Sequence, residues 1–157
     1  MVSIEWLKKA ELFKTLDESQ LNSLLSYAHV ESFVEGHTIF KQGKEADSLY
    51  MLIEGGVDLT VKTQEKNDFM TSKIEKEGAV FGMASLLEPY HYNVTATCLN
   101  PSKVLILPAN QLIRAMEKDP KMGMEIMKKL ATIYFNRLNH LRSGISDLLN
   151  KLKLKMP

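Results

Sequence analysis

The stretch GAVFGMASLLEPYHYNVTAT, residues 78–97, combines two strand-like segments with a short helical segment between them. Val80 and Phe81 favour a strand that ends at Gly82, residues 83–87 favour one helical turn, and residues 94–97 are rich in β-branched side chains again. A helix that begins at a glycine leaves backbone N–H groups without intrahelical acceptors, and such groups attract anions. The local pattern therefore indicates a loop that could hold an anionic group.

Short strands separated by glycine turns flank this stretch on both sides. About eight such strands are typical of a closed β-roll or sandwich rather than of an α/β fold. We predict one domain with N-terminal helices over 1–29, a β-roll over 30–108 and C-terminal helices over 109–157. The predicted strands lie at 30–34, 38–40, 48–53, 57–61, 69–74, 80–81, 94–97 and 104–107.

A long helix is predicted to begin at Asp119-Pro120, because a capping residue followed by proline is typical of a helix start. Its apolar residues recur at spacings of three and four, as the core positions of a coiled coil do. A second apolar stripe (Ile126, Leu130 and Ile133) marks only its first half. We therefore predict that the helix packs on its own domain and also forms a homodimer; the alternative is a helix folded back along one chain. The predicted dimer seam consists of Met127, Ala131, Tyr134, Leu138, Leu141, Ile145 and Leu148.

The composition argues against several classes of protein. The 20 basic and 19 acidic residues nearly cancel, so nothing indicates general attraction to nucleic acid or to an anionic membrane. No apolar run approaches the length of a membrane span, and the N-terminus does not resemble a signal peptide. With a single cysteine, Cys98, an internal disulfide is impossible, and we expect a cytoplasmic location.

The residues that carry catalytic or metal chemistry are scattered. The four histidines form no H-x-H pair, so no metal site is predicted, and no cofactor is expected. Ser85 and Cys98 have no base at a recognisable spacing, which gives no support to nucleophilic catalysis. We therefore predict a protein without catalytic residues.

Glycines and apolar residues recur along the chain in the pattern Phe33…Gly36…Ile39…Gly43…Tyr50-x-Leu52-x-x-Gly55-x-Val57, followed by Val80-Phe81-Gly82. As a whole, this pattern resembles the cyclic nucleotide-binding domain, the sensory module of catabolite-activator-type regulators, cyclic-nucleotide-dependent kinases and gated channels. The resemblance runs from Leu12 into the last helix. It implies an eight-stranded double-stranded β-helix (jelly roll), flanking helices and a phosphate-binding cassette within 78–97. Because the sequence ends directly after the long helix, we expect no helix-turn-helix domain and no direct nucleic-acid contact.

The cassette departs from the family at its two charged positions. The family's acidic residue holds the ribose hydroxyl and its arginine holds the cyclic phosphate, whereas Met83 and either Tyr92 or Asn93 occupy those places here. A hydrogen bond to a charged group contributes about 1.5–3 kcal/mol, so losing both costs about 3–6 kcal/mol, a factor of hundreds to tens of thousands in affinity. We therefore expect no binding of cyclic AMP or cyclic GMP at the usual affinity.

The predicted ligand site is the cassette itself, where Ser85 and Thr95 offer hydroxyl groups. Two possibilities are open for the position at which the family has its phosphate-binding arginine. His91, or the pair Tyr90 and Tyr92, could supply a new ligand contact, or Tyr92 could fill the vacated space. The predicted site residues are Phe81, Gly82, Met83, Ala84, Ser85, Leu86, Tyr92, Asn93, Val94 and Thr95.

The expected function is a non-catalytic regulatory or sensor module that signals through its C-terminal helix to a separate protein partner. Its ligand would be a small anionic or nucleotide-like molecule. One alternative is a ligand-free structural or dimerisation module that keeps the fold after losing the pocket. A second alternative is an ordinary cyclic nucleotide sensor with an atypical cassette.

Overall fold

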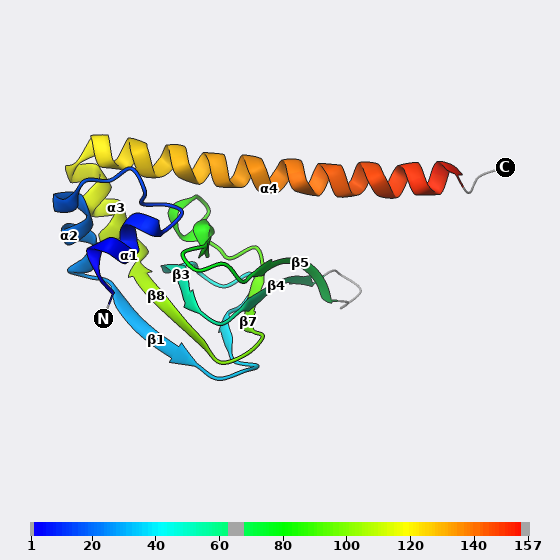
Figure 1. Ribbon diagram of the computed structural model, residues 1–157, viewed down its shortest axis with the longest axis horizontal. Coiled ribbons are helices and arrows are strands. Elements are labelled where there is room, and N and C mark those ends of the chain that lie inside the picture. Colours follow the sequence, from blue (N-terminus) through cyan, green and yellow to red (C-terminus); the bar gives the residue numbers. More distant parts are fainter. Residues whose placement is uncertain (1, 63–67, 155–157) are drawn as a thin grey trace.

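The computed structural model describes residues 2–62 and 68–154, and it contains two four-stranded antiparallel sheets with helices at one end (Figure 1). One sheet has the strand order β1-β8-β3-β6 and the other β2-β7-β4-β5. This arrangement confirms the predicted jelly roll. The strands are β1 (His29–Phe33), β2 (Thr38–Phe40), β3 (Ser48–Glu54), β4 (Val57–Lys62), β5 (Asp68–Ile74), β6 (Val80–Phe81), β7 (Thr95–Cys98) and β8 (Ser102–Pro108).

Strands β3 and β8 are buried on both faces, which explains why their sequences are continuously apolar instead of alternating. On one face, Tyr50 lies opposite Ile106 and Leu52 opposite Val104, and these four residues belong to the core inside the roll. On the other face, Met51 pairs with Leu105 and packs into a second core beneath the helices. Since successive strand residues point to opposite faces, the two strands join both cores.

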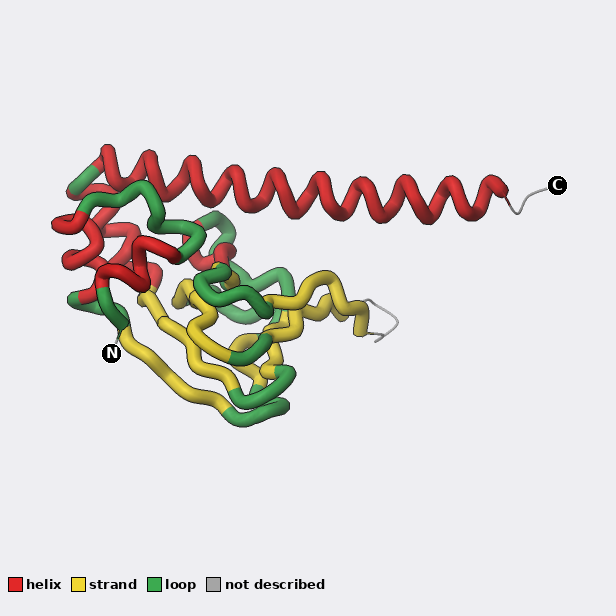
Figure 2. The backbone as a smooth tube through the Cα atoms, in the orientation of Figure 1, coloured by secondary structure: helices red, strands yellow, loops and turns green. Residues whose placement is uncertain are grey.

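The helices of the second core come from both ends of the chain. Helix α2 (Glu18–Leu25) begins with a capping box, in which the Asp17 carboxylate accepts from the Gln20 N–H and the Gln20 side chain accepts from the Asp17 N–H. Asp119 caps the first turn of α4 by accepting from the Met122 N–H at 3.1 Å. The tube in Figure 2 shows the short helices and the start of the long helix gathered at one end of the roll. The other helices are α1 (Ile4–Lys9), α3 (Ala109–Lys118) and α4 (Pro120–Leu154).

Helix α4 has 35 residues, or about 50 Å at 1.5 Å per residue, and its C-terminal part extends past the roll (Figure 1). The predicted short stripe is buried: Ile126 is 0%, Leu130 2% and Ile133 5% exposed. The seam beyond it is open, with Ile145 50% and Leu148 58% exposed. The packing of the first half of α4 on its own domain is therefore confirmed.

Ile126→Ala should lower the free energy of unfolding by about 2–5 kcal/mol, because it removes a fully buried side chain and leaves a cavity in the core beneath the helices. The matched control is Thr132→Ala on the exposed side of the same helix, which should change stability by about 0.5 kcal/mol or less. Urea denaturation of both variants measures the difference. Equal effects would show that α4 does not depend on this stripe.

Candidate functional site

The cassette turns from strand to helix at Gly82, which has a left-handed backbone with φ of 75°. A Cβ atom at this position would lie 2.9 Å from Tyr50 Cδ2 and 3.2 Å from the Ser48 carbonyl oxygen, closer than side chains pack. Glycine is therefore required by both conformation and space. The turn that follows, η1 (Met83–Leu86), is a 3₁₀ helix, and it confirms the single helical turn predicted from the sequence.

The two cassette hydroxyls are engaged within the protein. Ser85 is buried, and its Oγ donates to the Gly82 carbonyl oxygen at 2.8 Å, while its N–H reaches the same oxygen at 3.1 Å. Thr95 Oγ1 accepts a hydrogen bond from the Gln42 N–H at 3.0 Å. Ser85 thus differs from the expected free donor, because its hydroxyl closes the turn that it sits on.

Tyr92 lies inside the roll and is 4% exposed. Its ring stacks on Phe40 with centroids 3.8 Å apart. Its hydroxyl donates to the Ser48 carbonyl oxygen at 2.8 Å and accepts from the Ser48 N–H at 3.2 Å. Burial raises the pKa of Tyr92 well above its usual value, so the phenol is neutral at physiological pH. Tyr92 therefore fills space in the core and also lines the adjacent cavity.

A cavity of about 460 Å³ adjoins the cassette, and we call it the cassette pocket. Six of the ten predicted site residues line it, whereas Ala84, Ser85, Leu86 and Thr95 do not. Its wall is largely apolar and comes from two sources, the interior of the roll and helix α4. The lining residues are Phe40, Leu59, Val61, Ser72, Phe81, Gly82, Met83, Tyr92, Asn93, Val94, Tyr134, Arg137, Leu138 and Leu141.

Arg137 is the one charged side chain among these lining residues, and sequence reasoning missed it. Its Nη2 donates to the carbonyl oxygen of Val80, immediately before the cassette, at 2.8 Å. His91, the predicted candidate for a similar role, is exposed and does not line the pocket. Its Nδ1 lies 2.7 Å from the Pro89 carbonyl oxygen. No local motif marks Arg137, because only the fold brings α4 over the cassette.

Three seam residues of α4, Tyr134, Leu138 and Leu141, also line the cassette pocket. Tyr134 is half-buried, and burial raises the pKa of its hydroxyl. The other four predicted seam residues lie elsewhere on the exposed surface of the helix. The same helix face therefore contributes to the pocket wall and continues beyond it as an open apolar stripe.

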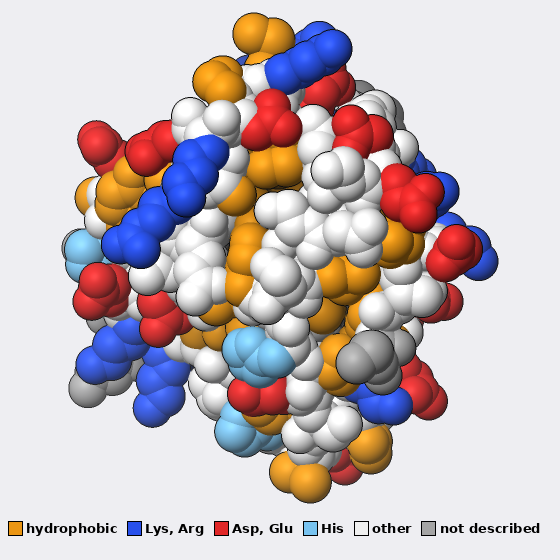
Figure 3. Space-filling view, turned by 90° about the vertical axis from the view of Figure 1, so that its left-hand side faces the viewer, with side chains coloured by type: hydrophobic (Ala, Val, Ile, Leu, Met, Phe, Trp, Pro, Cys, Tyr) orange, Lys and Arg blue, Asp and Glu red, His pale blue; other side chains and the backbone are white. Residues whose placement is uncertain are grey.

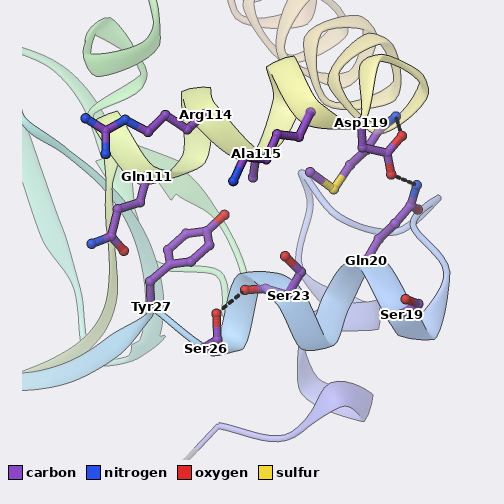
Figure 4. Close-up of a pocket in the computed structure, with 11 residues that line it drawn as sticks. Ser19, Gln20, Ser23, Ser26, Tyr27, Gln111, Arg114, Ala115 and Asp119 are labelled. Atoms are coloured by element: carbon purple, nitrogen blue, oxygen red, sulfur yellow. Dashed lines mark hydrogen bonds between the residues drawn. The ribbon is translucent and has the colours of Figure 1, made fainter.

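A second, larger hollow of about 560 Å³ lies between α2, α3 and the start of α4 (Figure 4). Its cations, Arg114 and Lys118, are exposed, and Asp119 is held by Gln20 at 3.1 Å. Tyr27 projects between α2 and α3, where its hydroxyl has no hydrogen-bond partner among the described residues and burial raises its pKa to about 12. Despite its size, this hollow is a polar groove between helices, and the cassette pocket is the more enclosed apolar cavity.

The surface carries both signs of charge. Figure 3 views the end of the molecule at which the helices gather, and basic and acidic side chains are interspersed over it. Among the residues that the structure describes, no three His, Cys, Asp or Glu side chains form a group suited to a metal ion. None of the described helices combines the length and the apolar character needed to cross a membrane.

Comparison with known proteins agrees with this geometry. Residues 30–119 match the family model of the cyclic nucleotide-binding domain. A global nitrogen regulator of Nostoc sp. (strain PCC 7120) is 30% identical over 66% of this chain and 47% of its own length. The CRP-like cAMP-activated global transcriptional regulator of Mycobacterium tuberculosis is 23% identical over 92% of this chain and 62% of its own length. The chain belongs to the cyclic nucleotide-binding domain family.

Solved structures show the same fold. A protein of Geobacter metallireducens GS-15, described as a cyclic nucleotide-binding protein, superimposes with a TM-score of 0.78 at 31% identity, covering 88% of this chain and 99% of that one. The chain spans about half to three fifths of the length of the curated regulators that it resembles. One of these relatives is named as a global nitrogen regulator and the other as a global transcriptional regulator, and the chain is homologous to both through the cyclic nucleotide-binding domain.

Tyr92→Phe should lower the free energy of unfolding by about 1–3 kcal/mol, because it deletes a buried hydroxyl that donates to one backbone group of β3 and accepts from another. Tyr90→Phe is the matched control, since Tyr90 is 39% exposed and should tolerate the change at almost no cost. Thermal unfolding compares the two. A Tyr92 variant as stable as the wild type would contradict the structural role of this hydroxyl.

Proposed function

We propose that this chain is a ligand-sensing regulatory module in which a small molecule in the cassette pocket biases the position of α4. The supporting observation is that the pocket has two walls, one from the roll and one from Tyr134, Arg137, Leu138 and Leu141 of α4. A ligand that touches both walls binds one arrangement of the helix better than others. Such differential binding is what allows a ligand to shift a conformational equilibrium.

A homodimer through α4 is the proposed means of output. The seam is apolar and repeats at coiled-coil spacing, and most of it is exposed in the isolated chain. A second copy of the helix would cover this stripe, and an uncovered stripe of this length is a liability for a protein in water. Because Leu138 and Leu141 belong to both the pocket and the seam, occupancy of the pocket and pairing of the helices would be linked.

A ligand-free dimerisation module is the second candidate function. It is favoured by two residues at or beside the places of the family's charged contacts, since Met83 is buried and Tyr92, one of the two candidates for the place of the arginine, packs on Phe40. A thermal-shift screen with nucleotides, nucleotide analogues and small aromatic acids separates the candidates. Stabilisation by a compound supports sensing, and the absence of any stabilisation supports the ligand-free module.

Calorimetric titration with cyclic AMP and cyclic GMP should give no low-micromolar dissociation constant. The reason is that none of the described lining residues is an acid that could hold the ribose, and the one cation among them comes from α4 instead of the cassette. Asn93→Arg places a cation at a cassette position that lines the pocket, and it should strengthen cyclic AMP binding by roughly tenfold or more. Low-micromolar binding by the wild type would instead identify an ordinary sensor with an atypical cassette.

Ile145→Glu combined with Leu148→Glu should convert the protein from a dimer to a monomer of 17.8 kDa without changing the roll. Both residues lie on the seam but outside the cassette pocket, so ligand binding by the roll is left intact. Ser146→Glu combined with Asn150→Glu adds the same charge off the seam, and this control should remain dimeric. Light scattering at tens of micromolar measures the masses; a monomeric wild type would disprove the proposed pairing.

A further inference from the structure

Arg137 is a cation with unused donors at the edge of an apolar cavity. It is half-buried, and its one recorded hydrogen bond joins Nη2 to the Val80 carbonyl oxygen. Where the structure describes side chains, the ion pair that it contains is His29–Glu31, so Arg137 has no carboxylate partner there. A guanidinium carries five N–H donors in a planar fork that matches a carboxylate or sulfonate group. Arg137 can therefore receive an anion from outside the chain.

The rest of the cassette pocket favours an apolar ligand body. Phe40, Leu59, Val61 and Val94 line it, and the hydroxyl of Tyr92 bonds to Ser48. Besides Tyr92 and Tyr134, the polar side chains of the lining are Ser72, Asn93 and Arg137. A ligand with several polar groups would leave some of them unpaired in this cavity, which weakens binding. The volume of about 460 Å³ is within the usual range for small-molecule sites.

We propose that the cassette pocket binds an organic monoanion with an apolar body, and that the carboxylate or sulfonate group of this ligand pairs with Arg137. The proposal rests on the sensing function proposed above and names the class of ligand. The cation that the family places in the cassette is here supplied by the long helix. The anion therefore lies against α4, while the apolar body lies among the aromatic and aliphatic residues of the roll.

This placement makes the ligand a bridge between the roll and α4. Arg137 already joins α4 to β6 through the Val80 carbonyl oxygen. Leu138 and Leu141 follow it on the same wall of the pocket and continue into the exposed seam. An anion held by Arg137 thus acts directly on the segment of α4 where the pocket and the seam overlap.

The test uses two dyes that differ by one charged group. 8-Anilinonaphthalene-1-sulfonate is an apolar monoanion, and N-phenyl-1-naphthylamine is its neutral counterpart without the sulfonate. Both gain fluorescence in apolar surroundings. Titrations compare the wild type with Arg137→Gln and with Arg142→Gln, the latter removing an exposed arginine of the same helix that does not line the pocket.

Arg137→Gln should weaken binding of the sulfonate dye roughly tenfold or more, as expected for the loss of a charge-assisted pair. Binding of the neutral dye should change less than about twofold, and Arg142→Gln should behave as the wild type. Arg137→Lys should recover part of the affinity, since it restores the charge without the fork. Decanoate should displace the sulfonate dye from the wild type, whereas decanamide and cyclic AMP should not.

Three results would overturn the inference while leaving sensing intact. If Arg137→Gln weakens both dyes equally, the residue shapes the pocket instead of pairing with the anion. If the neutral dye binds and the affinity for the sulfonate dye is unchanged by Arg137→Gln, the pocket takes an uncharged ligand. Displacement of the dye by low-micromolar cyclic AMP would overturn the apolar ligand class. If neither dye binds and no compound stabilises the protein, the sensing function fails together with the inference.

Discussion

The burial of one stripe of α4 against the core beneath the helices is the constraint on which the rest of the molecule depends. Ile126, Leu130 and Ile133 fix both the position of the helix and its rotation about its own axis. Once these residues face the domain, Arg137 one turn after Ile133 is directed toward the cassette. The open seam on the adjacent face follows from the same rotation.

That core exists because β3 and β8 have two apolar faces. One face closes the interior of the roll and the other receives the helices, so the roll and the helical end cannot separate without exposing a buried surface. The cassette lies between these two cores. Phe81 is buried in the roll interior, whereas Met83 and Leu86 pack into the core beneath the helices. Packed side chains therefore connect α4 with the cassette.

The chemistry of the cassette pocket follows from the side chains that surround it. Tyr92 occupies part of the space beside the cassette, and its hydroxyl is satisfied by the backbone of β3. The described residues that line the remaining cavity are largely apolar, with one cation that comes from α4. This lining supports the proposed ligand, a single anionic group on an apolar frame, since a cyclic nucleotide would need polar partners for its ribose as well. The fold is that of the family, and the cation beside the cassette comes from α4.

The helical turn after Gly82 and the two stripes of α4 could be predicted from the sequence, because each is a local pattern with a local physical cause. The jelly roll followed from the spacing of glycines and apolar residues along the whole chain and from the family that this spacing resembles. The sequence also indicated a departure from the family at Met83 and at either Tyr92 or Asn93. The sequence did not show that the Ser85 hydroxyl donates to the Gly82 carbonyl oxygen within its own turn. Nor did it show that Tyr92 both packs in the core and lines a cavity. Arg137 lies far along the chain from Val80, and no spacing rule connects them. Only the tertiary structure decided that contact, because the packing of α4 brings the two together.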